Sequence, residues 1–233
     1  MLDSSSGPGR QVFILKIGGS TPPSSTKKMA ERSSFFVRKS MDFEQDFLTV
    51  KPTGVPLKDG VMLVAVPFFN DAYFNRSVVL LTDYDSSGAA GVIVNRRTNV
   101  PIREAKSDWR IDGKFFFGGP VRVEGIIALH TFSGSGKYNP VTEGVYSGID
   151  DTLISMIEYN AIPTMKYRFY LGYSGWGEGQ LDDEVERGMW VVTEYRRELL
   201  FCDSPATVWE TAVRHLGPNY RHWLDVPKNV SEN

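Results

Sequence analysis

Short runs of apolar, mostly β-branched or aromatic residues recur through the middle of the chain, each bounded by Gly, Pro, Asn or Asp. Runs of this length and composition predict β-strands. Because few polar residues interrupt them, we expect both faces of the resulting sheet to be buried. The predicted strands are residues 61–66, 77–81, 91–95, 115–117, 126–130, 167–172, 189–193 and 198–201.

Three segments have the apolar spacing of helices, and the clearest of them follows Ser204. We expect Ser204 to cap this helix, with Pro205 in its first turn and Gly217 just after its last turn. Two shorter helices are predicted over residues 151–159 and 180–187. Many strands followed by late helices predict an α+β fold with a complex mixed sheet and about three packed helices, rather than a regularly alternating doubly wound fold.

The first 41 residues differ in charge and composition from the rest. They hold seven Lys or Arg against two acids, a net +5, so the formal total of −2 leaves −7 on residues 42–233. This leader (residues 1–41) is rich in Ser, Pro and Gly, and its apolar run over residues 12–15 is too short for a secretory signal. We interpret it as a disordered or mis-assigned extension, with an organelle transit peptide as the alternative. Residues 42–233 are predicted to form a single domain that begins with an amphipathic turn at 42–48.

Several classes of function are disfavoured by composition. No apolar run approaches the ~20 residues of a membrane-spanning helix. The single cysteine, Cys202, excludes internal disulfides, and we expect it to be buried rather than redox-active. The histidines, His130, His215 and His222, lack metal-ligand spacing, so no metal or cofactor is expected. Direct binding of nucleic acid by the acidic domain is disfavoured because such binding requires clustered Lys and Arg.

The stretch LGYSGWGEGQLDDEVERGMWV, residues 171–191, is the most distinctive part of the chain. We predict a strand, a tight loop, a short helix and a second strand. Trp176 lies among four glycines, and an exposed indole there indicates a surface that engages a ligand. The glycine spacing is also typical of phosphate-binding loops, but Glu178 and the three acids at 182–184 would repel a phosphate.

Several sequence blocks together resemble the YqgE/AlgH family of small bacterial proteins over residues 57–217. They are MLVAVPFFNDAYFNRSVVLLTDYDSSGAAGVIVNR, FFFGGPV, IIALHTF, LGYSGWGEGQLDDEVERGMWVV and LLFCDSPATVWETAVRHLG. The resemblance implies a bifurcated, barrel-like sheet, and members have been called transcriptional regulators without an agreed biochemical activity. Two positions depart from the pattern, since Tyr84 replaces a frequent histidine and Arg97 a frequent proline. The tail at residues 220–223 resembles members from Bacteroides-like bacteria, which implies a cytoplasmic location.

Polar and glycine-rich strand ends form the candidate binding surface. If residues 77–81 and 91–95 form a hairpin, Arg76 and Asn95 lie at the same end of the sheet. Other strand ends could converge there, giving a surface made of Arg76, Asn95, Gly118, Gly119, Pro120, His130, Tyr173, Trp176, Gln180 and Glu184. The alternative is purely structural, with Arg76 paired to an acid such as Glu184 while Asn95 and Gln180 hold loop backbone.

Two classes of function are consistent with these residues. The first is a non-enzymatic binding or regulatory module that engages a protein or small-molecule partner, as a monomer or a homo-oligomer. The second is a hydrolase-like enzyme that uses His130 or the carboxylates of Asp182, Asp183 and Glu184 near Arg76. A pocket lined jointly by His130, Arg76 and a carboxylate would favour the enzyme. An exposed Trp176 would favour the binding module.

Overall fold

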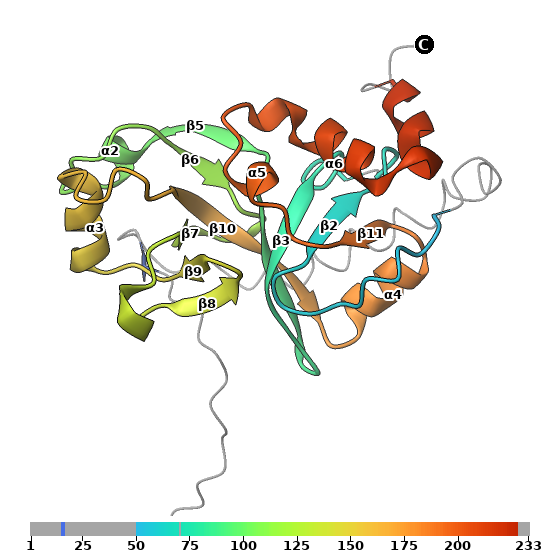
Figure 1. Cartoon of the computed structure of the whole chain (residues 1–233), viewed down its shortest axis with the longest axis horizontal. Coiled ribbons are helices and arrows are strands. Elements are labelled where there is room, and N and C mark those ends of the chain that lie inside the picture. Colours follow the sequence, from blue (N-terminus) through green and yellow to red (C-terminus); the bar gives the residue numbers. More distant parts are fainter. Residues whose placement is uncertain (1–14, 17–49, 70, 228–233) are drawn as a thin grey trace, which may run out of the picture.

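Eleven strands form one mixed sheet in a computed structural model that describes residues 15–16, 50–69 and 71–227 (Figure 1). The main path is β11-β2-β3-β4-β10-β7-β9-β8, with β1 added to β7, β6 to β10 and β5 to β6. The strands are β1 (Leu15–Lys16), β2 (Met62–Ala65), β3 (Val78–Asp85), β4 (Gly88–Ile93), β5 (Arg97–Pro101), β6 (Lys114–Phe117), β7 (Val121–His130), β8 (Asn139–Thr142), β9 (Val145–Ser147), β10 (Tyr167–Gly177) and β11 (Trp190–Thr193). The predicted boundary at residue 41 and the turn at 42–48 lie outside the described residues, so the division into leader and domain stays a prediction.

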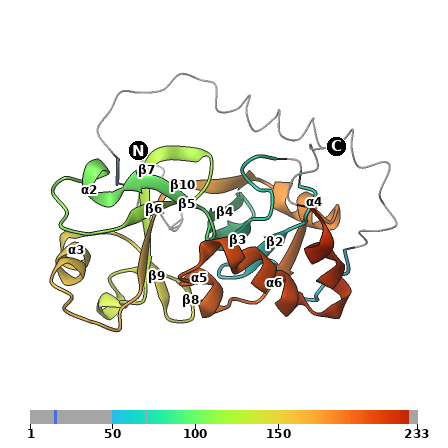
Figure 2. The same cartoon turned by 90° about the horizontal axis from the view of Figure 1, so that it is seen from above.

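The long strand β10 joins two halves of the sheet. Its first part pairs antiparallel with β7, from Tyr167 opposite His130 to Tyr173 opposite Val121, and parallel with β6. Its last four residues pair with β4 instead. The two halves extend to opposite sides of β10 in both views (Figures 1 and 2). The α+β class and the bifurcated mixed sheet are therefore confirmed, and the described strands do not close into a barrel.

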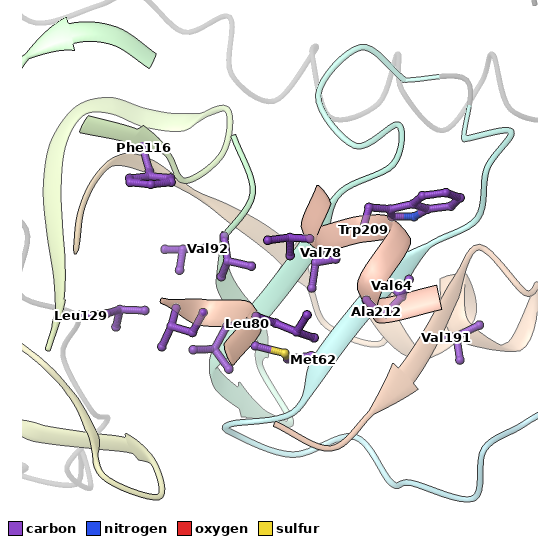
Figure 3. Close-up of a cluster of buried hydrophobic side chains, with 14 of the residues drawn as sticks. Met62, Val64, Val78, Leu80, Val92, Phe116, Leu129, Val191, Trp209 and Ala212 are labelled. Atoms are coloured by element: carbon purple, nitrogen blue, oxygen red, sulfur yellow. The ribbon is translucent and has the colours of Figure 1, made fainter. Parts of the chain in front are cut away.

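Both faces of β2 and of the first part of β3, residues 78–81, are buried, as their uninterrupted apolar sequence predicts. Successive side chains of a strand point to opposite faces. Met62 and Val64 accordingly belong to one hydrophobic cluster, while Leu63 and Ala65 belong to another. Trp209 covers the first cluster from outside the sheet (Figure 3). A third cluster fills the other half of the sheet, around Phe115, Phe169 and Leu153.

The three predicted helices are present, but one begins differently from the expectation. Ser204 makes no side-chain capping bond; its carbonyl instead accepts from the N–H of Thr207, at 3.1 Å, in a 3₁₀ turn that precedes the helix. The α-helices are α2 (Ile102–Ala105), α3 (Asp151–Glu158), α4 (Gln180–Glu186), α5 (Arg197–Leu200) and α6 (Val208–Leu216), and the 3₁₀ helices are η2 (Gly134–Gly136), η3 (Pro205–Thr207) and η4 (Pro218–Asp225). Within the part of the chain that the structure describes, no helix is both long and apolar enough to cross a membrane.

The structure differs from the sequence prediction at other places where the local sequence is compatible with more than one secondary structure. The strand predicted over residues 198–201 is wrong, because Leu199 and Leu200 reach the core from the helical turn α5. A short apolar run does not distinguish a strand from a buried helical turn. Cys202 follows this turn and is half-buried, so the expectation of a buried strand cysteine is also wrong. The loop after residue 172 is shorter than predicted, since β10 continues to Gly177.

Candidate functional site

The Gly118–Gly119 turn after β6 lies directly against the backbone of β10. The N–H of Gly118 donates to the carbonyl of Leu171 at 2.9 Å, and the carbonyl of Gly118 accepts from the hydroxyl of Ser174 at 3.1 Å. Both partners lie in β10. A side-chain carbon on Gly118 would lie 2.2 Å from the carbonyl oxygen of Gly172. One on Gly119, where φ is +151°, would lie 2.3 Å from the carbonyl carbon of Tyr173. The close approach of this turn to β10 therefore requires glycine at both positions. Pro120, which follows them, is exposed.

Trp176 is buried, which contradicts the exposed indole expected from the sequence. Its side chain is only 7% exposed, and its Nε1–H donates to Glu184 at 2.8 Å. Trp190 donates to the same carboxylate oxygen at 2.9 Å. Gln180 donates to the other oxygen at 2.9 Å and accepts from the N–H of Gly177 at 3.1 Å. These side chains therefore fasten α4 to β10 and β11.

Asn95 holds the first residue of β3 in place. Its Oδ1 accepts from the N–H of Val78, and its Nδ2 donates to the carbonyl of Arg76, both at 2.9 Å. β3 and β4 pair as an antiparallel hairpin. The expectation that Arg76 and Asn95 lie at the same end of the sheet is therefore confirmed.

The Arg76 side chain fixes the C-terminal segment of the described chain. Its guanidinium donates to the carbonyls of Val226 and Pro227, the latter at 3.1 Å. It also lies 4.6 Å above the Trp209 ring, in a cation–π contact. In the structural alternative, the pairing of Arg76 with Glu184 is wrong, since the indoles bind that carboxylate, whereas Asn95 and Gln180 do bond to backbone.

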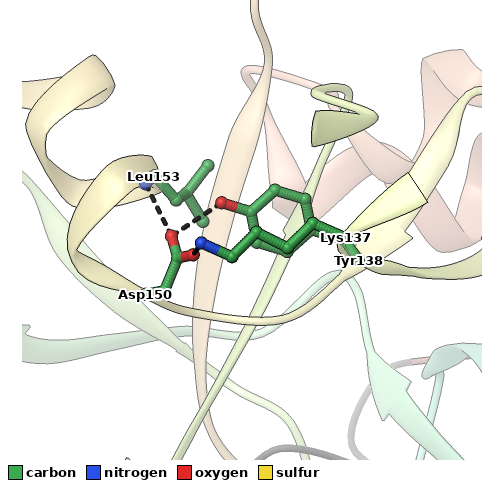
Figure 4. Close-up of polar contacts among 4 residues, drawn as sticks. All are labelled: Lys137, Tyr138, Asp150 and Leu153. Atoms are coloured by element: carbon green, nitrogen blue, oxygen red, sulfur yellow. Dashed lines mark hydrogen bonds and ion pairs between the residues drawn. The ribbon is translucent and has the colours of Figure 1, made fainter. Parts of the chain in front are cut away.

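His130 ends β7 inside the third hydrophobic cluster and is fully buried. The ring of Tyr138 meets it edge-to-face at 4.6 Å. The Tyr138 hydroxyl donates at 2.7 Å to Asp150, which pairs with Lys137 and accepts from the N–H of Leu153 at 2.8 Å (Figure 4). Among the described residues, neither nitrogen of His130 makes a hydrogen bond of normal geometry. His130 therefore lies in an apolar site that disfavours its charged form.

We expect His130 to make folding weaker in mild acid. Burial lowers its pKa from 6.5 to about 4, against smaller opposing effects of the Gly148 and Phe132 backbone and of Asp150. Between pH 6.5 and about pH 4, His130 binds a proton more readily in the unfolded chain than in the folded protein. The contribution of neutral His130 to the free energy of unfolding is therefore complete above pH 6.5 and is lost as the pH falls toward about 4. The loss attributable to His130 is about 2 kcal/mol at about pH 5 relative to about pH 7.5. Urea denaturation at both pH values measures it. His130→Leu should lose less stability on acidification, and an unchanged pH dependence would contradict the assignment.

A cleft of about 370 Å³ opens just beyond the end of β7. Its charged side chain is Arg197 from α5, which has no ion-pair partner among the described residues. Thr131 also lines the cleft, and its hydroxyl oxygen accepts a hydrogen bond from the N–H of Lys166 at 3.0 Å. The remaining lining comes from the segment of Thr131 and from two further segments, and it consists of Phe132, Ser133, Gly144, Ile162, Thr164 and Met165. Sequence reasoning did not find this cleft, because no local motif links its separated segments.

The structure places Gly118 against the strand that precedes Asn95 and leaves His130 apart. Gly118 accepts from the N–H of Ile93 beside Asn95 at 2.9 Å, and the ring of Phe74, near Arg76, lies 6.3 Å from that of Trp176. His130 pairs with the opposite end of β10, roughly 30 Å along the strand from Trp176. It therefore does not meet the carboxylates of α4, and the structure does not bring His130 together with Asp182, Asp183 and Glu184. Across the described residues, no His, Cys, Asp and Glu side chains form a group able to hold a metal ion.

Comparison with known proteins agrees with this fold. The model of a family described as AlgH-like matches residues 62–221. The chain belongs to the AlgH-like family. A UPF0301 protein of Chlorobium limicola is 34% identical over 74% of this chain and 94% of the relative, and one of Bacteroides thetaiotaomicron is 28% identical over 81% and 97%. The solution structure of the AlgH protein from Pseudomonas aeruginosa has a TM-score of 0.58 at 23% identity, covering 78% of this chain and all of that one. A crystal structure from Corynebacterium diphtheriae has a TM-score of 0.64 at 19% identity, covering 78% and 98%.

Membership of the AlgH-like family supplies the fold without a biochemical activity. The two positions that depart from the family pattern both make internal contacts here. The Tyr84 hydroxyl donates to Asp182 at 2.6 Å, a bond that raises the pKa of Tyr84. The Arg97 guanidinium lies 5.4 Å from the centre of the Phe116 ring. Function must therefore be argued from the surface of this chain.

Proposed function

We propose that this AlgH-like protein is a non-enzymatic binding module that takes a small anionic ligand in the cleft beyond β7. The observation that supports this is Arg197, whose guanidinium borders the cleft without an acidic partner among the described residues. A guanidinium recognises a carboxylate or phosphate through paired hydrogen bonds. The volume of about 370 Å³ suits a small molecule. Apolar lining from Phe132, Ile162 and Met165 favours a ligand that also has a hydrocarbon portion.

The lining residues support binding rather than catalysis. Three hydroxyl groups border the cleft, from Thr131, Ser133 and Thr164. A hydroxyl becomes an effective nucleophile when a neighbouring base removes its proton. The described lining contains no His, Cys, Asp, Glu or Lys that could be this base. The hydroxyls are therefore assigned to hydrogen bonding of the ligand.

A regulatory role would act through the ligand or a protein partner rather than through direct DNA contact. Residues 42–233 carry a net charge of −7, and DNA binding requires concentrated positive charge. Two of the three arginines at positions 96, 97 and 103 have polar partners within the protein. Arg96 donates to the carbonyl of Asn75 at 2.7 Å, and Arg103 pairs with Asp112 at 3.0 Å. This arrangement supports a module whose anionic partner is small.

Replacing Arg197 should weaken the binding of small anions. Titrations of the full chain with small carboxylates, phosphates and their neutral amide or ester analogues, followed by NMR, would identify a binder. We expect Arg197→Ala to lower its affinity at least tenfold, about 1.4 kcal/mol, because a charge-assisted hydrogen bond is lost. Arg196→Ala is the matched control, since Arg196 is also exposed but pairs with Glu198 at 3.6 Å. Equal affinities of the two variants, or preference for the neutral analogues, would contradict the proposal.

A further inference from the structure

The outer edge of β7 is only partly paired by the rest of the domain. On one edge of β7, β10 pairs with residues 126–130 and, after a register shift, with Val121. On the other edge, β9 pairs only with Leu129 and His130. An unpaired strand edge presents a row of backbone N–H and C=O groups that another extended segment can bind. The edge from Val121 to Ile126 is therefore a template for an added strand.

A segment of the leader already pairs with this edge. Leu15 lies opposite Ile126 and Lys16 opposite Gly125, antiparallel, as the short strand β1 beside β7 (Figure 1). The leader carries +5 and residues 42–233 carry −7, so long-range attraction favours the contact. Backbone pairing supplies the register, as in other proteins that recognise peptides by adding a strand to a sheet.

We propose that the outer edge of β7 is a docking surface for an extended, basic peptide segment and that the leader of the same chain is its resident occupant. While β1 is in place, the backbone groups at Gly125 and Ile126 are paired. A second extended segment pairs with Gly125 and Ile126 only after β1 has been displaced. This surface is separate from the cleft at the opposite end of β7.

Hydrogen exchange of the full chain tests this assignment. Leu15→Pro/Lys16→Pro removes two backbone N–H groups and disfavours β1. We expect exchange in a peptide fragment covering residues 121–127 to become about tenfold faster or more, while β3 stays protected. Ser33→Pro/Ser34→Pro, elsewhere in the leader, is the control and should leave β7 unchanged. Unchanged exchange in the first variant, or equal acceleration in both, would overturn the proposal. Loss of protection in β3 would show a global effect and would equally reject it.

Binding of a synthetic peptide with the sequence of residues 10–20 gives a second readout. We expect Leu15→Pro/Lys16→Pro to bind it at least about tenfold more tightly than the wild-type chain, in which the edge is occupied. Equal affinity, or no binding to either protein, would count against the docking surface. Protection of β7 that rises with protein concentration, together with a dimer in sedimentation, would assign β1 to a second copy and reject the occupant proposed here. Because Arg197 is not involved, these results are independent of the proposed ligand cleft.

Discussion

Gly119→Ala is expected to destabilise the protein by at least about 3 kcal/mol, because the added methyl group overpacks the contact between β10 and the turn that joins β6 to β7. Its carbon would lie 2.3 Å from the carbonyl carbon of Tyr173 and 2.4 Å from the nitrogen of Ser174. Both are backbone atoms of the strand that joins the two halves of the sheet, so they cannot move without disturbing its pairing. The φ of +151° adds strain for any residue with a side chain. Urea unfolding of the purified variant measures the effect.

Gly177→Ala is the matched control for Gly119→Ala. Gly177 lies in β10, the strand that Gly119 contacts, but the nearest atom to an added carbon there is Gln180 Oε1, at 3.9 Å. We expect its unfolding free energy to stay within about 0.5 kcal/mol of the wild-type value. If Gly119→Ala does not accumulate as a folded protein while Gly177→Ala does, the close-approach argument is supported. Similar urea midpoints for both variants would refute it.

Glu184→Leu should be the second large perturbation, with a loss of roughly 4 kcal/mol, because two buried donors lose their acceptor. Trp176 and Trp190 are 7% and 1% exposed, and both indole N–H groups donate to the same Glu184 oxygen. Water does not readily replace a carboxylate at this depth. The indole N–H signals of the two tryptophans in NMR should shift and exchange faster, and urea unfolding should give the free-energy loss.

Glu186→Leu is the matched control for Glu184→Leu, because it also removes an acid from α4 but no bond to an indole. Glu186 lies on the same helix and is exposed. We expect its unfolding free energy to change by about 0.5 kcal/mol or less. Glu184→Gln, which keeps one acceptor oxygen, should fall between the two. If Glu184→Leu is no more destabilising than Glu186→Leu, the two indole bonds do not stabilise the fold as the distances indicate.

Strand and helix identity followed from the sequence wherever burial imposed a clear pattern. β2 and β3 were predictable because both of their faces are covered, which leaves continuous apolar runs. β5, β8 and β9 were missed because their sequences are short and polar and two of them contain proline. These strands form through pairing with β6, with β7 or with each other, and local composition does not record this pairing.

Side-chain partners were harder to predict than elements because they come from distant segments. Arg168, for example, lies in an apolar strand and is 8% exposed. It lies 4.2 Å from the centre of the Phe116 ring and donates to the carbonyl of Val94 at 2.9 Å. Trp176 was expected at the surface because its glycine neighbours suggested a loop, whereas the strand continues and turns the indole inward. The cleft at Arg197 was missed for the same reason, since its lining comes from four separated parts of the chain: residues 131–133, 144, 162–165 and 197.

Identification of the molecule that Arg197 binds is the most direct test of the proposed function. The wild-type chain, Arg197→Ala and Arg196→Ala would be isolated under gentle conditions and compared by native mass spectrometry, and any released small molecule would then be identified. We predict that the wild type and Arg196→Ala retain the same anionic compound and that Arg197→Ala lacks it. Retention of that compound by Arg197→Ala, or a wild-type protein that carries no small molecule, would contradict a ligand-binding role for the cleft.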